Sequence, residues 1–220
     1  MGSTVSLRRC ARLLRLNRKT VARTFKLVSR LCHEQLYFET AFNPATNFTL
    51  DDLESFEHTK LKPLSVITAV TEERRVLAFR VAEMPAKGRL AEKSMRKYGK
   101  RKDGRSQARK DLFQELQGSV QPGCPIKSDE NPHYKADVKK FFPQSPYVTF
   151  LSKRSADTGQ GELKKVKYDP LFSLNHTFAM FRANISRLIR KTWCTTKQKE
   201  RLADHLAIYA VYHNAHLKTK

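Results

Sequence analysis

The chain has few cysteines, no long apolar run and half as many acids as bases, and each shortage excludes a class of protein. Its four cysteines are scattered, without a Cys-x-x-Cys pair, so neither a disulfide framework nor a zinc ribbon is expected, and a reducing cytoplasm fits best. No stretch approaches the roughly 18 apolar residues of a membrane span or forms the apolar core of a signal peptide. We therefore expect a cytoplasmic protein with no membrane partner.

The shortage of acids leaves the chain strongly basic. Its 43 Lys and Arg face 21 Asp and Glu, which gives a formal net charge of +22. Such a charge is typical of proteins that bind DNA or RNA, and it leaves a basic RNA-binding structural protein open as an alternative. A hydrophobic fraction of 40% with 13 Phe is enough for a folded core, which excludes a disordered basic tail.

Residues 6–31 have the apolar spacing of two helices separated by a short break. Asn17 is expected to cap the second helix. Ala11 in the first helix, Leu16 in the break and Val21 early in the second form a helix-turn-helix pattern, although an amphipathic hairpin with a solvated basic face is the alternative. In a helix-turn-helix, the second helix would present four DNA-binding side chains: Arg18, Lys19, Thr20 and Arg23.

The pattern changes to strands after an expected linker at residues 33–46. Period-2 alternation predicts three strands joined by tight connections, followed by alternating helices and strands. The order β-β-β-α-β-α-β-α is that of the α/β ribonuclease H-like fold, in which a parallel extension turns an antiparallel meander into a mixed sheet. We expect a DNA-binding region at 1–45 and a catalytic domain at 46–220. The expected strands are 48–56, 61–70, 75–81, 124–128 and 147–151, and the helices are 106–118, 133–142, 170–192 and 197–213.

Residues 87–110 are a basic segment interrupted by glycines. It carries eleven Lys or Arg and only two acids. It is either a solvated loop or a flexible segment that contacts phosphates. We favour the second interpretation, with Lys100 and Arg101 as candidate DNA contacts.

Two acids lie at or near the ends of expected strands. Asp51 follows the run 47–50, and Asp129 closes the run 124–128. In the ribonuclease H-like order, these two strands are neighbours, so the carboxylates should meet. Carboxylate pairs in such basic chains are suited to holding Mg²⁺ or Mn²⁺ against phosphates.

Three segments resemble bacterial insertion-sequence transposases of the DDE type, most closely the compact group related to insertion sequence one. They are residues 50–56 (LDDLESF), 128–134 (SDENPHY) and 175–194, which ends in RLIRKTWC. The resemblance implies that Asp51 bridges two metal ions and that Asp129 ligates one of them. It places Asn175 where the family has its third acid, with Arg182 at the following basic position. Glu162 is the rival third ligand, since its distance from Asp129 along the chain is like that in other DDE enzymes.

The resemblance implies a transposase that binds the terminal inverted repeats of an insertion sequence, cleaves the DNA and transfers the strand to a target. Its partner would be double-stranded DNA near the bacterial nucleoid, on which it would act as a homo-oligomer. Relatives carry a zinc-binding segment before the helix-turn-helix, which is lacking here, so a shortened chain that is inactive alone is also expected. A degenerate, catalytically inactive DNA-binding protein derived from a transposase is the first alternative function.

Overall fold

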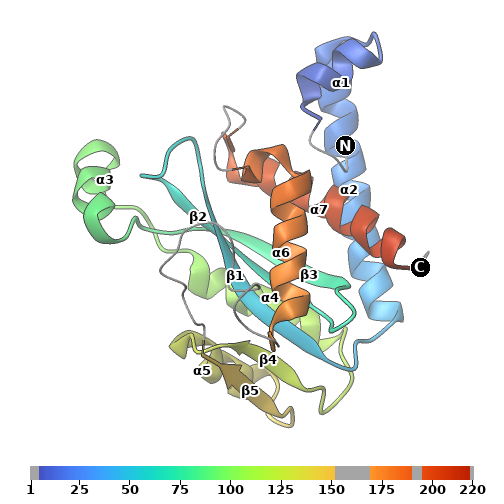
Figure 1. Ribbon diagram of the computed structural model, residues 1–220, viewed down its shortest axis with the longest axis vertical. Coiled ribbons are helices and arrows are strands. Elements are labelled where there is room, and N and C mark those ends of the chain that lie inside the picture. Colours follow the sequence, from blue (N-terminus) through green and yellow to red (C-terminus); the bar gives the residue numbers. More distant parts are fainter. Residues whose placement is uncertain (1–4, 152–168, 190–194, 219–220) are drawn as a thin grey trace.

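A five-stranded mixed sheet forms the centre of the protein, as the computed structural model in Figure 1 shows. The structure describes residues 5–151, 169–189 and 195–218. The sheet has the order β3-β2-β1-β4-β5, and it confirms the expected α/β class. Strands β1 (Phe48–Phe56), β2 (Pro63–Val70) and β3 (Val76–Glu83) form an antiparallel meander, to which β4 (Ile126–Asp129) and β5 (Tyr147–Phe150) add in parallel.

Helices cover both faces of this sheet (Figure 1). One face packs against α4 (Arg105–Gln117) and α5 (Pro132–Phe141), and the other against α6 (Phe172–Asn184) and α7 (Lys199–Lys218). Successive side chains of a strand point to opposite faces. In β1, Leu50 belongs to the α4–α5 core and Leu53 to the α6–α7 core. Because side chains alternate along the strand, these two residues fix the faces on which the remaining residues of β1 lie.

The N-terminal region is a helical hairpin that projects beyond the sheet (Figure 1). Helix α1 spans Leu7–Leu13 and α2 spans Arg18–Phe42. The expected cap is confirmed, because the Asn17 side chain accepts a hydrogen bond from the Lys19 backbone N–H at 2.8 Å. Leu16, the apolar residue of the expected turn, is 49% exposed.

The linker expected at residues 33–46 is wrong, because α2 continues through residue 42. Leu36 is buried in the α6–α7 core, and the Thr40 hydroxyl donates to the carbonyl of Leu77 on β3 at 3.2 Å. These contacts hold the second half of α2 against the sheet. The helix ends at Phe42, and its C-cap Asn43 directly precedes Pro44, where a helix cannot continue.

Two other segments differ from the sequence prediction. The basic segment is helical over η1 (Gly88–Leu90) and α3 (Ala91–Tyr98) rather than a loop throughout, and the Ser94 hydroxyl donates to the carbonyl of Leu61 at 2.7 Å. The long helix expected at 170–192 ends at Asn184, followed by η3 (Ser186–Leu188). Asn184 donates to the Tyr209 hydroxyl at 3.0 Å, while Ile185 adopts an extended backbone that stops the helix.

None of the helices within the described ranges combines the length and the apolar character that crossing a bilayer requires.

Candidate functional site

The structure brings Asp51 and Asp129 side by side on one face of the sheet. Strands β1 and β4 pair in parallel with Leu50 opposite Ser128, so the next pair in register is Asp51 and Asp129, on strands about 4.8 Å apart. Leu50 packs into the α4–α5 core, so both carboxylates point to the other face. Helix α6 packs against β1 and β2 on that face.

The pKa values of both carboxyl groups are raised. Burial and the charge of Asp129 raise the pKa of Asp51 to about 7, and burial also raises the pKa of Asp129. Two hydrogen bonds act in the opposite direction: the Asp52 N–H donates to Asp51 Oδ1 at 2.6 Å, and the Asn131 N–H donates to Asp129 Oδ1 at 3.2 Å. Carboxylates crowded in this way are stabilised by a shared proton or by a cation, and their oxygens fit a hard divalent ion.

Asp52 lies on the opposite face and serves a structural purpose. Its Oδ2 accepts a hydrogen bond from the hydroxyl of Tyr134 at 2.7 Å, and its Oδ1 accepts one from Ser65. Tyr134 is fully buried on α5, and burial raises its pKa well above its ordinary value. This network joins β1, β2 and α5 behind the carboxylate pair. Strand alternation between Asp51 and Asp52 is the sequence signal that could have predicted it.

Asn175 lies half-buried in the first turn of α6, the helix that packs against β1 and β2. Its Nδ2 donates to Asp169 Oδ2 at 2.9 Å, and the other carboxylate oxygen of Asp169 accepts from the Leu171 N–H at 2.9 Å. The Asn175 carbonyl oxygen is therefore the atom of this amide that could ligate a cation. Sequence reasoning did not find Asp169 as the partner of Asn175.

A third carboxylate does not join the pair within the described ranges, since no group of three or more His, Cys, Asp or Glu suited to a metal occurs there. A third side-chain ligand from these residues would have to be of another type, as Asn175 is. The rival ligand, Glu162, lies outside the described residues.

Most of the candidate DNA contacts are exposed. Arg18, Lys19, Thr20 and Arg23 are all exposed at the start of α2. Arg18 and Lys19 line an open groove of about 890 Å³ with Arg8 and Arg187, which gathers positive charge between the hairpin and η3. Lys100 and Arg182 are also exposed.

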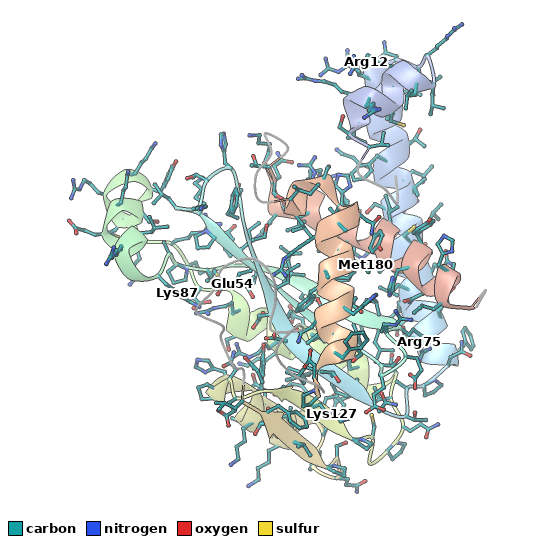
Figure 2. All side chains as sticks on the ribbon, in the orientation of Figure 1. Arg12, Glu54, Arg75, Lys87, Lys127 and Met180 are labelled. Atoms are coloured by element: carbon teal, nitrogen blue, oxygen red, sulfur yellow. The ribbon has the colours of Figure 1, made fainter. Side chains whose placement is uncertain are left out.

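Arg101 differs from these residues because its side chain is mostly buried in an ion pair. Its side chain is 10% exposed and its guanidinium pairs with Glu57 at 3.2 Å, so Arg101 is the least accessible of the candidate DNA contacts. Lys87 pairs with Glu54 of β1 at 3.1 Å, and Figure 2 labels these two residues side by side. Sequence reasoning missed these pairs because Glu54 on β1 and Glu57 just after it lie more than 30 residues from their partners along the chain.

Comparison with the models of known protein families finds no match, and comparison with curated proteins finds no significant one. The resemblance to transposases therefore stays a prediction.

The raised pKa of Asp51 predicts a pH-dependent stability in the absence of a divalent ion. The folded state keeps this proton up to a pKa of about 7, whereas the ordinary value is 3.8. In this interval the folded state binds more protons than the unfolded state, so the free energy of unfolding falls as the pH rises. Three pKa units correspond to about 4 kcal/mol. The free energy of unfolding of Asp51→Asn, measured by urea denaturation, should therefore rise relative to that of wild type by up to this amount between about pH 4 and pH 8.

Mg²⁺ near pH 8 should restore stability to wild type and not to Asp51→Asn, because a bound cation replaces the proton. Asp111→Asn, an exposed acid on α4, is the matched control and should follow wild type. A wild-type-to-variant difference that stays constant with pH would contradict the raised pKa.

Proposed function

We propose that the chain is a DDE-type transposase with a ribonuclease H-like catalytic domain, which cleaves DNA at the ends of an insertion sequence and transfers the freed 3′ end to target DNA. The observation that supports it best is the carboxylate pair of Asp51 and Asp129. This pair lies on one face of a sheet in which an antiparallel meander continues into parallel strands. A strongly basic chain around an acidic pair is suited to phosphodiester chemistry.

Asp51 and Asp129 would hold Mg²⁺ or Mn²⁺, with the carbonyl oxygen of Asn175 as an uncharged third ligand. Ions bound there would neutralise the charge on the transferring phosphoryl group and activate the attacking oxygen. The chain's own part is to keep both carboxylates on adjacent strands and to release the Asp51 proton near neutral pH. The Tyr134–Asp52 hydrogen bond fixes β1 from behind.

The α1–α2 hairpin would act as the helix-turn-helix that binds the terminal inverted repeats. Its support is the capped start of α2 and the exposed set of Arg18, Lys19, Thr20 and Arg23. Arg8 and Arg187 would add positive charge from the adjoining groove. Lys100 and Arg182 would contact DNA on the side of the catalytic face.

The proposal is tested by incubating the chain with Mg²⁺ and DNA that carries the inverted repeats flanking its coding region. We expect cleavage at the repeat ends that stops when the metal is chelated. Binding to these repeats without cleavage under any divalent ion would instead indicate a degenerate DNA-binding protein. Equal binding to unrelated RNA, without cleavage, would indicate an RNA-binding structural protein.

DNA binding should weaken steeply as the salt concentration rises. Each phosphate contact contributes about 0.9 to the slope of log K against log salt. The double variant Arg18→Ala/Arg23→Ala should therefore lower the slope by about 2 in a fluorescence-anisotropy titration. Lys139→Ala, an exposed base on α5 on the opposite face of the sheet, is the control and should leave the slope unchanged. Binding insensitive to salt would contradict the electrostatic contact.

A further inference from the structure

Helix α2 exposes a stripe of large apolar side chains on the side facing away from the core. Leu27 is 51% exposed, Leu31 50%, Phe38 54% and Phe42 80%. Their spacings of four, seven and four residues place them on one side of a helix. Val21, Phe25 and Leu36 are buried on the opposite side of the same helix. Helix α2 therefore has two apolar sides, and the rest of the chain covers only one of them.

The C-terminal end of the stripe is a cluster of aromatic rings. Phe38 and Phe42 stack with ring centroids 6.4 Å apart, and Tyr37 adds an edge contact to Phe38 at 5.7 Å. Tyr37 is itself 50% exposed. Exposed apolar patches of this extent on soluble proteins usually mark a protein–protein contact, and aromatic anchors contribute most to such contacts.

The charges along α2 specify what covers the stripe. The first half of the helix, residues 18–30, carries five bases and no acid, whereas residues 31–42 carry Glu34 and Glu39 and neither Lys nor Arg. In an antiparallel pair whose stripes overlap over residues 27–42, Arg30 of each helix lies against Glu39 of the other helix, so a base meets an acid at both ends of the contact. A parallel orientation places like charges together, which is unfavourable.

We propose that two copies of this chain pair through antiparallel α2 helices, with the two-fold axis beside Glu34 and Gln35. In this register, Leu31 packs against Phe38 of the partner subunit, and Leu27 packs against Phe42 of the partner subunit. The two hairpin turns then lie at opposite ends of the paired helices, about 50 Å apart along their axis at 1.5 Å per residue. This pairing does not depend on the proposed catalytic function.

The oligomeric state of the full chain without DNA tests the pairing. Sedimentation equilibrium should show a dimer at micromolar concentration for wild type. The double variant Leu31→Asp/Phe38→Asp should weaken self-association about 100-fold or more, because it places four charges in the apolar contact. Met95→Asp on α3, which replaces an apolar residue that is 54% exposed, is the matched control and should stay dimeric. A monomeric wild type, or a dimer that the double variant leaves intact, would overturn the proposal.

Disulfide cross-linking tests the orientation without relying on the double variant. Glu34→Cys lies beside the two-fold axis and should give a cross-linked dimer on oxidation, since a disulfide needs Cα atoms within about 7 Å. Leu27→Cys should not, because the antiparallel register separates its two copies by about 20 Å along the helix. Wild type, with its native cysteines, is the background control. Cross-linking at residue 27 instead of 34, or at neither, would refute the antiparallel arrangement.

Discussion

Asp51→Asn is expected to lower Mg²⁺-dependent DNA cleavage by at least about a thousandfold, equivalent to roughly 4 kcal/mol of transition-state stabilisation. Asp129→Asn should have the same effect, because the two carboxylates lie side by side and each supplies negative charge that the other cannot replace. The measurement is single-turnover cleavage of inverted-repeat DNA under saturating Mg²⁺.

The matched control for both variants is Asp111→Asn, which removes an exposed acid from α4 and should cleave like wild type. DNA affinity should be unchanged or slightly higher in all three variants, because only negative charge is removed. Cleavage that survives in either Asp51→Asn or Asp129→Asn would contradict the assignment of the site.

Asn175→Ala should reduce cleavage by about a hundredfold or more while leaving DNA binding intact. The change removes the carbonyl oxygen proposed as third ligand, and a half-buried amide at this position contributes little to the core. Glu162→Ala is the companion variant and should cleave normally. If Glu162→Ala abolishes cleavage and Asn175→Ala does not, the third ligand is Glu162.

The Asp169–Asn175 hydrogen bond permits a sharper version of this experiment. Asn175→Asp alone puts a second carboxylate against Asp169, 2.9 Å from its oxygen in place of the amide nitrogen, so it should be impaired by like-charge repulsion. Adding Asp169→Asn exchanges the two partners and restores the hydrogen bond. We expect the double variant to recover cleavage, and failure of the exchange would indicate that Asn175 acts only in packing.

The order of strands and the pairing of the acids could be predicted because both follow from local patterns. Period-2 alternation in residues 48–83 predicted the meander, and the buried run before Asp129 predicted β4. Because β4 pairs in parallel with β1, Asp129 at the end of β4 lies beside Asp51. Helix α2 was predicted too short, because its second half is apolar on two sides and lacks a single amphipathic face, although Asn43 and Pro44 marked its end.

Contacts between distant parts of the chain could not be predicted. Arg101 pairs with Glu57 across 44 residues, and nothing in either local sequence distinguishes these side chains from solvated ones. At the end of α6, Asn184 likewise donates to the hydroxyl of Tyr209 on α7, 25 residues away along the chain. Asn175 and Asp169 are only six residues apart, but the hydrogen bond between them depends on the path by which the chain enters α6.

The most direct test of the central claim is anomalous diffraction from crystals of the full chain grown with Mn²⁺. We predict an anomalous peak in contact with carboxylate oxygens of both Asp51 and Asp129, at coordination distances of about 2.0–2.6 Å, and no such peak in Asp51→Asn crystals. A wild-type crystal with ordered Asp51 and Asp129 side chains and no manganese between them would contradict the claim.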